Sequence, residues 1–328
     1  MKTKVLRSLC VLVLLFSLPW HTAQAQAQPW PDKDRVVRAI CAFPVGQGAD
    51  IIVRYFARKL AEVSGLTVIV ENRVGQMGGI AATSVARSEP DGYTIFITPA
   101  SASHGMNPFL FKKIGYDPVK DFTPVTTLAK IFFVLAVDAN SPYKSVAELT
   151  EVLKKKGSKG AYAFISPTAN VASALYKRGT GIQALGVPYK ANVQTLSEMQ
   201  SGQLDFQFID GGSAFGLIAA GRLRALAVTT PKRAALMPDI PTMAESGVPG
   251  FDITPWWAVF LPPNAPRPVV DKLESWFNQI VAMEDTRSFL AKLSAEPFPG
   301  NSKFLAEFLR NDIKKWGELI KLANIEPQ

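Results

Sequence analysis

Two hydrophobic periods alternate along the first third of the chain. Short apolar runs predict buried strands at 36–43, 67–70 and 93–98. Between these runs, apolar residues recur at helical spacing around 52–63 and at 80–88. Strands that alternate with helices in this way favour parallel pairing through right-handed crossovers.

A second series of the same kind follows a stretch at 101–124, which we expect to be a loop. Its pattern predicts strands at 131–137, 161–165, 185–189, 204–209 and 223–229, and helices at 146–155, 171–177, 193–201 and 213–220. After a proline-rich connection, the pattern predicts a strand at 253–261 and helices at 268–283 and 302–324. The tail offers no further parallel strands, so we expect it to complete the first series.

The order of elements predicts an α/β protein of two lobes, each a mostly parallel sheet flanked by helices. We expect the first lobe to comprise residues 29–132 together with 228–328, and the second lobe residues 133–227. The chain would then cross near 131–137 and return near 223–229. Two crossing strands make a hinge, and a ligand would bind in the groove between the lobes.

The first 25 residues resemble an export signal. Lys2, Lys4 and Arg7 precede an apolar run at 9–18, and the small residues of Ala23-Gln24-Ala25 suit a signal peptidase. The run is too short to cross a membrane, which needs roughly 20 apolar residues. We therefore predict cleavage near Ala25, or two residues later, and a periplasmic location.

Composition excludes several classes of protein. The net charge is +9, but the basic residues are scattered, and the one run, at 154–156, fits a solvated helix end. Nucleic-acid binding would need a basic stripe with exposed aromatic residues. After cleavage Cys41 is the only cysteine, so no intramolecular disulfide is possible and Cys41 is expected to be a small core residue.

The chain offers little for catalysis. After cleavage His104 is the only histidine, and we expect it to form hydrogen bonds in a loop. There is no G-x-S-x-G elbow and no cluster of Cys, His or carboxylates for a metal. The sequence therefore predicts no catalytic residues, no metal and no cofactor.

Glycine-bearing turns follow successive strands and give the strongest signal for binding. Glycines let backbone amides approach a ligand, and helix N-termini carry unpaired N–H groups and partial positive charge. The first turn contains Phe43, Gly46, Gln47, Gly48, Ala49 and Asp50, with Asp50 expected as the helix N-cap. A tight structural turn remains the alternative for this segment.

Further strand ends meet the same groove, because parallel strands end at one edge of a sheet. The second turn of the first lobe offers Gln76 and Met77, and the third offers Thr98, Ala100 and Ser101. The facing lobe offers Ser166, Thr168, Asn170, Tyr189, Asp210 and Gly211. Asp210 either pairs with the solute or caps the next helix, and Trp256 either lines the pocket or faces the core.

Short motifs, in a specific order, are similar to those of the Bug-type extracytoplasmic solute receptors of tripartite tricarboxylate transporters. They include Asp50 with Arg54, Val70-Glu71-Asn72-Arg73, Pro90-Asp91-Gly92-Tyr93-Thr94, Tyr116-Asp117-Pro118, Val187-Pro188-Tyr189-Lys190, Gly202-Gln203-Leu204-Asp205 and Pro241-Thr242-Met243-Ala244-Glu245-Ser246-Gly247. The resemblance implies a type II periplasmic-binding (Venus-flytrap) fold, a carboxylated solute held partly through waters, and membrane permease subunits as partners.

The sequence departs from the family pattern at the expected pocket. Gln47 interrupts the first glycine run, Gln76-Met77 stands where Ala-Gly is usual, and Asn170 lies near the usual place of a histidine. These neutral amides predict a ligand that has polar groups beyond one carboxylate, or an amide or aromatic ring.

The sequence thus predicts a periplasmic, monomeric receptor that captures a small carboxylate in the cleft, delivers it to a tripartite tricarboxylate-type permease and performs no chemistry. Two alternatives stay open: a receptor that presents its ligand to a signalling partner, and a secreted enzyme on the same scaffold.

Overall fold

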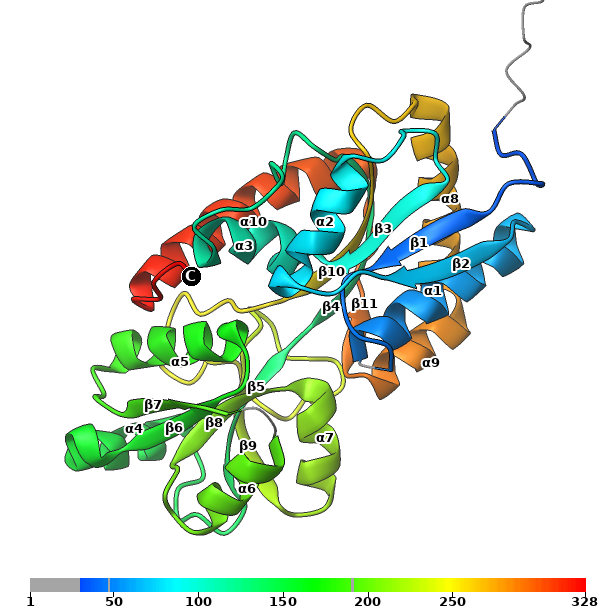
Figure 1. Cartoon of the computed structure of the whole chain (residues 1–328). Coiled ribbons are helices and arrows are strands. Elements are labelled where there is room, and N and C mark those ends of the chain that lie inside the picture. Colours follow the sequence, from blue (N-terminus) through cyan, green and yellow to red (C-terminus); the bar gives the residue numbers. More distant parts are fainter. Residues whose placement is uncertain (1–29, 47, 190–191) are drawn as a thin grey trace, which may run out of the picture. The chain divides into compact units, whose positions relative to one another are not determined.

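The first of two β-sheets is built from both ends of the chain. In the computed structural model, which describes residues 30–46, 48–189 and 192–328, its strand order is β11-β4-β10-β3-β1-β2. The strands are β1 (Val37–Cys41), β2 (Val68–Asn72), β3 (Thr94–Pro99), β4 (Thr123–Ile131), β10 (Trp256–Leu261) and β11 (Ala295–Pro297). β1 pairs parallel with β2 and β3, whereas β10 is antiparallel to β3 and β4 (Figure 1).

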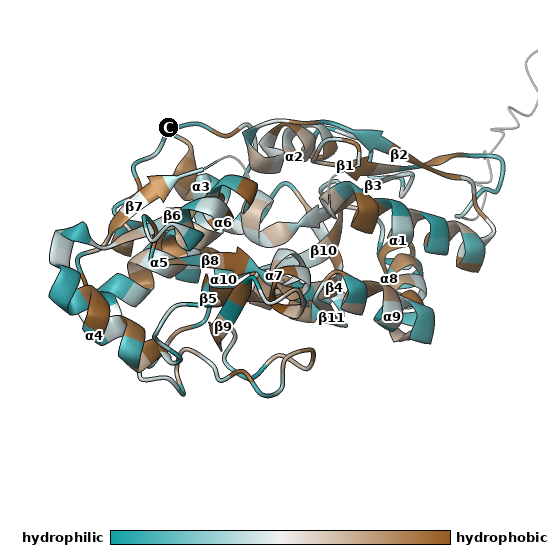
Figure 2. Cartoon of the chain, turned by 90° about the horizontal axis from the view of Figure 1, so that it is seen from below, coloured by the Kyte–Doolittle hydropathy of each residue, from teal (hydrophilic) through white to brown (hydrophobic). Residues whose placement is uncertain are grey.

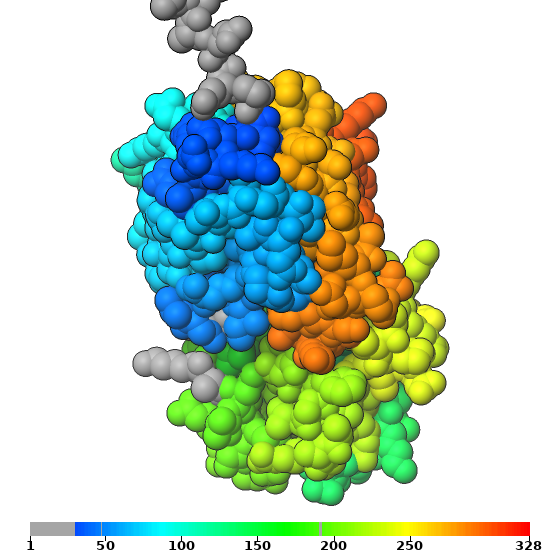
Figure 3. All heavy atoms as spheres, turned by 90° about the vertical axis from the view of Figure 1, so that its right-hand side faces the viewer, coloured from blue at the N-terminus to red at the C-terminus, as the bar shows by residue number. Residues whose placement is uncertain are grey.

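Helices cover both faces of this sheet. They are α1 (Gly48–Ser64), α2 (Gly79–Ala86), α3 (Asn107–Leu110), α8 (Arg267–Ala282), α9 (Glu284–Lys292) and α10 (Ser302–Leu322), with a π-helix at Ser101–Met106 before α3. The blue α1 and the orange α8 and α9 lie side by side (Figure 3). Tyr55 of α1 stacks on Phe289 of α9 and donates its hydroxyl to Thr286, which joins the N-terminal and C-terminal parts of the chain.

The second sheet has the order β7-β6-β8-β5-β9. Its strands are β5 (Phe133–Asp138), β6 (Ala161–Phe164), β7 (Leu185–Pro188), β8 (Phe206–Asp210) and β9 (Leu223–Val228), and its helices are α4 (Val146–Lys156), α5 (Pro167–Thr180), α6 (Asn192–Gln200) and α7 (Gly211–Ala219). β6 is parallel to β7 and β8, whereas β5 is antiparallel to β8 and β9. The strands are mostly hydrophobic, while the helices carry both hydrophobic and hydrophilic positions (Figure 2).

The chain passes between the sheets at two places. β4 ends at Ile131 in the first sheet and β5 begins at Phe133 in the second, so the crossing is a nearly continuous strand path (Figure 1). The return runs from β9 to β10. The connection between them contributes Met243 and Phe251 to the buried cluster that also contains β5 and β8 residues.

The α/β fold of two sheets, each flanked by helices, confirms the predicted fold class. Both sheets are mixed rather than mostly parallel, because the strands next to the crossings pair antiparallel. The loop predicted at 101–124 is wrong in part, since it contains the π-helix, α3 and the start of β4. α9 and β11 were not predicted at all. The signal segment at 1–25 lies outside the described residues.

Candidate functional site

A cavity of about 410 Å³ lies between parts of the chain that carry the two sheets. We call it the cleft cavity. Met77, Leu110, Phe111, Ile325 and Gln328 line it from the first sheet's side. From the second sheet's side it is lined by Phe164, Ile165, Ser166, Pro167, Asn170, Pro188 and Tyr189. Its size falls within the usual range for small-molecule sites.

The N-terminus of α5 forms one wall of the cleft cavity. Ser166 is the N-cap residue, and its hydroxyl accepts a hydrogen bond from the Ala169 amide at 3.2 Å. Pro167 follows at the first helical position, which suits a helix start because proline has no N–H to satisfy. Asn170 lies one turn further and also lines the cavity. A helix N-terminus carries partial positive charge, so this wall favours an anionic group.

Tyr189 is fixed at the end of β7. Its amide donates to the Phe164 carbonyl at 2.9 Å, and its hydroxyl donates to the Glu198 carboxylate on α6. Desolvation and the nearby Glu198 raise the pKa of the Tyr189 hydroxyl to about 12. Tyr189 is therefore a neutral phenol at physiological pH, and it presents an aromatic surface to the cavity.

The turn after β2 has an unusual backbone. Gln76 and Met77 both have positive φ, 47° and 48°, and lie between Gly75 and Gly78, which are also positive. Asn107 supports the turn by donating from Nδ2 to the Gln76 carbonyl at 2.8 Å. Left-handed backbone is costly for residues with a side chain, and such strain is concentrated at functional sites. Met77 lines the cleft cavity, whereas Gln76 is exposed and does not.

Asp50 holds the first glycine turn in place through hydrogen bonds. The prediction that it is the N-cap is wrong, because α1 already begins at Gly48. Its side chain is about 2% exposed, and it accepts hydrogen bonds from the Gly46 amide (2.9 Å), Arg54 Nε (2.8 Å) and Asn72 Nδ2 (2.7 Å). Burial alone would raise the pKa of Asp50, but these hydrogen bonds and the Arg54 charge lower it to about 2.

Asp50 therefore positions the turn and is not available to a ligand. Gly46 and Gly48 are exposed and Ala49 is half-buried. Phe43 packs against the core of the first sheet, and its carbonyl accepts from Asn72. None of these residues lines the cleft cavity. Gln47 lies outside the described residues.

The residues of the third turn of the first sheet are buried and form hydrogen bonds inside the protein. The Thr98 hydroxyl shares a hydrogen bond with Ser103, and the Ser101 hydroxyl accepts from the Trp256 amide at 2.9 Å. Ala100 is fully buried. Trp256 is a core residue whose Nε1 donates to Asp312 at 2.8 Å, so it does not form a pocket wall. These four residues stabilise the fold and lie away from the cavity lining.

The turn after β8 lies at the crossing between the sheets. Asp210 caps α7, because its side chain accepts a hydrogen bond from the Ser213 amide at 2.9 Å. Of the two roles predicted for Asp210, helix capping is therefore the one that the structure contains. A Cβ at Gly211 would lie 2.6 Å from the Phe132 ring, so glycine is required there by close packing. Thr168 is buried in the first turn of α5 and does not line the cavity.

His104 is a core residue in the π-helix and not a loop residue as predicted. Its ring stacks on Phe260, with centroids 4.2 Å apart, and Nδ1 shares a hydrogen bond of 2.9 Å with Ser103. Burial lowers the pKa of His104 to about 3, so it is neutral at physiological pH. Cys41 is a buried free thiol, as predicted.

The prediction missed part of the cavity wall. Leu110 and Phe111 fall in the stretch that was expected to be a loop, and Ile325 and Gln328 follow the last helix. The apolar run Phe109-Leu110-Phe111 is a signal that could have been used, because three consecutive large apolar residues rarely occur in a solvated loop. No local signal marks Ile325 or Gln328.

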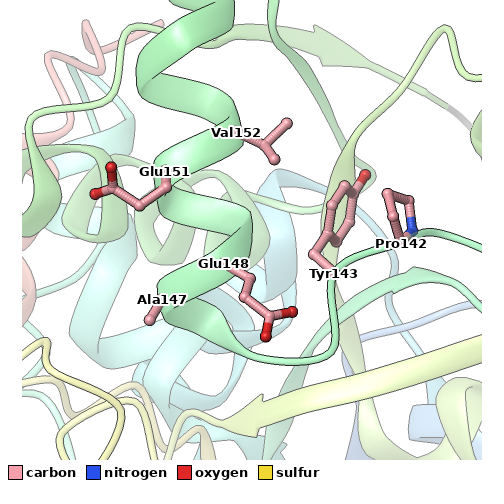
Figure 4. A pocket seen from close by; sticks show the side chains of 6 residues that line it. All are labelled: Pro142, Tyr143, Ala147, Glu148, Glu151 and Val152. Atoms are coloured by element: carbon pink, nitrogen blue, oxygen red, sulfur yellow. The ribbon is translucent and has the colours of Figure 1, made fainter.

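A second cavity, of about 420 Å³, lies on the outer helix α4. Figure 4 shows its lining residues, with Pro142 and Tyr143 across from the helix. Glu148 accepts from the Lys144 amide, and Glu151 pairs with Lys154, so both carboxylates already have partners. This second cavity contains none of the predicted site residues, and we do not assign it to the ligand.

Two further features of the described residues concern metals and membranes. No group of three or more His, Cys, Asp or Glu side chains in that part of the chain is arranged to hold a metal ion. Over the same residues, no helix combines the length and the hydrophobicity that crossing a membrane requires.

Solved structures place this fold among the periplasmic solute-binding proteins. The chain is similar to R. palustris Rpa4515 with adipate, with a TM-score of 0.77 and 31% identity, covering 91% of this chain and 100% of that one. It is also similar to the periplasmic binding protein BugD (TM-score 0.73, 29% identity, 90% and 99% covered) and to MatC from Rhodopseudomonas palustris with bound malate (0.71, 27%, 87% and 99%).

Sequence comparison defines the family. Residues 52–325 match the tripartite tricarboxylate transporter family receptor, and the chain belongs to this family. It is 32% identical to the UPF0065 protein in the tcbD-tcbE intergenic region of Pseudomonas sp. (strain P51), over 87% of this chain and 85% of that protein. It is 26% identical to protein BugT of Bordetella pertussis, over 96% and 97% of the two chains.

Proposed function

We propose that this protein is a periplasmic receptor that captures a small carboxylate in the cleft cavity and delivers it to a permease of the tripartite tricarboxylate type. The observation that carries the proposal is the cavity itself. Segments that flank both sheets contribute its walls, and the N-terminus of α5 faces it at Ser166, Pro167 and Asn170. A carboxylate at this wall would interact with the helix dipole and with polar side chains.

The relatives support a carboxylate ligand. Two structures that are 31% and 27% identical to this chain carry adipate and malate in their names. The lobe division proposed from the sequence, 29–132 with 228–328 and 133–227, would put the cavity between the lobes, where closure buries a ligand. Packing of the connection against the second sheet argues for moving the second boundary towards residue 253.

The proposal involves binding without chemistry. Of the four predicted site residues that line the cavity, Tyr189 is kept neutral by its raised pKa, and Ser166 is engaged as a helix cap. We propose further that the chain is exported with cleavage near Ala25 and acts as a monomer. A ligand bound by such a receptor is recovered unchanged, whereas an enzyme on the same scaffold would return product.

Isothermal titration of the mature protein with mono-, di- and tricarboxylates tests the proposal. Micromolar affinity corresponds to about 8 kcal/mol, of which one helix N-terminus supplies about 2 kcal/mol at most, so hydrogen bonds and closure must supply the rest. We expect at least one carboxylate to bind and to raise the melting temperature. A folded protein that binds no carboxylate of the panel, and from which native mass spectrometry releases none, would contradict the proposal.

A further inference from the structure

Asn107 packs against the turn that carries Met77, although it does not itself line the cleft cavity. Its side chain is fully buried. Its Nδ2 donates to the Gln76 carbonyl at 2.8 Å and lies 3.5 Å from the Met77 carbonyl. A Cβ added at Gly79 would lie 3.4 Å from the same nitrogen, so the turn packs closely on this amide. One buried side chain thus contacts both residues of the Gln76-Met77 pair, whose φ is positive.

Pro108 explains why a tyrosine is needed beside Asn107. In a π-helix the carbonyl of each residue accepts from the amide five residues later, and the Asn107 amide follows this pattern by donating to Ala102. The same pattern would pair the Ser103 carbonyl with residue 108, but Pro108 has no N–H. The Tyr116 hydroxyl donates to the Ser103 carbonyl instead.

This hydrogen bond fixes the orientation of the Asn107 amide. The Tyr116 hydroxyl has one proton, which it donates to Ser103, so towards Asn107 its oxygen can only accept, across 3.2 Å. The Gln76 carbonyl can also only accept. Both neighbours therefore require the NH₂ end of the amide, and the opposite orientation would lose both hydrogen bonds. Burial raises the pKa of Tyr116 to about 12, which keeps its proton in place at neutral pH.

We propose that Asn107 is a positioning residue of the cleft cavity. Tyr116 orients its amide, the amide holds the Gln76-Met77 turn, and the turn places Met77 in the wall against the captured carboxylate. Left-handed backbone is unfavourable at two adjacent residues with side chains, so without this donor the turn should relax and Met77 should leave the wall. The inference rests on the proposed function and adds to it a residue that controls affinity without touching the ligand.

Amide exchange tests the positioning role without a ligand. The Gly78 amide donates to the Gly75 carbonyl at 3.0 Å and reports on the turn. In Asn107→Ala its exchange should become about tenfold faster or more, measured relative to the slowest core amides of the same variant so that a general loss of stability cancels. Asn278→Ala is the matched control, because Asn278 also donates from Nδ2 to a backbone carbonyl, that of Gly300 at 2.9 Å, outside the cavity lining. In this control the relative exchange of Gly78 should equal that of the wild type.

Titration with hexanoate, adipate, malate and citrate tests the consequence for binding. Each acid that the wild type binds should bind Asn107→Ala about tenfold more weakly, and Asn278→Ala within about twofold of the wild type. Asn107→Asp serves if the alanine variant does not fold. Its ionised carboxylate cannot donate to the Gln76 carbonyl but its protonated form can, so its affinity relative to the wild type should recover as the pH is lowered from about 8 to about 5.

The outcomes separate this inference from the proposed function. Equal losses of affinity in Asn107→Ala and Asn278→Ala, an unchanged relative exchange of Gly78, or an Asn107→Asp variant whose relative affinity is independent of pH would overturn the positioning role. Each of these results leaves the proposed function standing, because the wild type still binds an acid. A wild type that binds none of the four acids would overturn the proposed function and this inference with it.

Discussion

At the scale of single residues, Asp50 shows how a buried charge can position a binding loop. Three donors from β2, α1 and the turn itself converge on one carboxylate. The sequence analysis predicted that Asp50 lies in the glycine turn and contacts the ligand. A carboxylate at a helix start can either hold the turn or contact a ligand, and the sequence does not distinguish these two roles. The hydrogen bonds of Asp50 with Asn72 and Arg54, which only the structure reveals, favour the role of holding the turn.

Asp50→Asn should destabilise the protein by about 2–3 kcal/mol at pH 7, since the amide cannot accept from all three donors. The pKa of Asp50 is about 2 when folded and 3.8 ordinarily, so its contribution is present above pH 3.8 and is lost as the pH falls towards 2. Chemical denaturation at several pH values measures this. Glu151→Gln, which removes an exposed ion pair, is the control and should cost under about 0.5 kcal/mol. Equal effects of the two substitutions would refute the positioning role.

His104 makes the protein sensitive to acid. Its pKa is about 3 when folded and 6.5 ordinarily, so the unfolded chain binds the extra proton between these values. The stability contributed by the neutral ring is therefore complete above pH 6.5, and it is lost at about 1.4 kcal/mol per pH unit as the pH falls towards 3. The sequence could not predict this, because it gave no sign that the stretch at 101–106 is a buried helix.

His104→Gln keeps a hydrogen-bonding side chain and removes the titration. We expect the variant to be about 2 kcal/mol less stable at pH 7.5, because the glutamine loses the contact with Phe260. Between pH 6.5 and 4.5 the gap from the wild type should narrow or reverse. Denaturant titrations across this range measure the difference, and parallel pH profiles of the two proteins would exclude His104 as the acid-sensitive group.

At the scale of elements, the sequence pattern predicted the strands whose buried residues are apolar. It missed elements that bury polar side chains or consist mostly of polar residues. The runs at β1, β3 and β10 were found within a few residues. β4 was largely missed because it buries the polar residues Thr126 and Thr127; the Thr126 hydroxyl donates to the Gly300 carbonyl at 2.8 Å. α9 was missed because most of its residues are polar or charged.

The cavity was predictable only in part, for a physical reason. Met77, Ser166, Asn170 and Tyr189 lie in the turns and helix starts that come after strands, and strand order alone brings such positions to one edge. Gln328 reaches the cavity through backbone hydrogen bonds with Leu110 and Lys112, far away in the chain. Contacts of this kind leave no periodic signal in a sequence.

α5 offers a test of the helix terminus as a binding element. Ser166→Ala removes the N-cap and should cost about 1 kcal/mol of stability. It should also weaken carboxylate binding about threefold to tenfold, because the terminus loses its ordering and a polar side chain. Ser145 is the N-cap of α4 and accepts from Glu148 at 3.2 Å, outside the cleft cavity. Ser145→Ala should therefore show a similar loss of stability with unchanged affinity, and calorimetry distinguishes the two. An equal loss of affinity in both variants would argue against the α5 site.

At the scale of the whole protein, α10 links the first sheet to the segment that returns from the second. Its residues Trp316 and Ile320 share a buried cluster with Val171 and Ala172 of α5. Lys315 of α10 lies 3.2 Å from Asp252 in the connection and 3.5 Å from the buried Asp312. Burial raises the pKa of Asp312, although Lys315 and the Trp256 hydrogen bond oppose the rise. Lys315 is thus the cation that both compensates a buried carboxylate and connects α10 to the crossing.

Lys315→Met should destabilise the protein by about 1–3 kcal/mol at pH 7, less than for a fully buried pair because Lys315 is partly exposed. Without Lys315 the folded pKa of Asp312 rises further, so the folded state binds more protons than the unfolded one, and the stability falls as the pH rises above 3.8. The deficit should therefore shrink as the pH is lowered towards 4. Asp312→Asn in the same chain removes the buried charge while keeping an acceptor for Trp256, and it should restore most of the stability at pH 7. A deficit that is independent of pH and unrelieved by Asp312→Asn would mean that Lys315 acts only through Asp252.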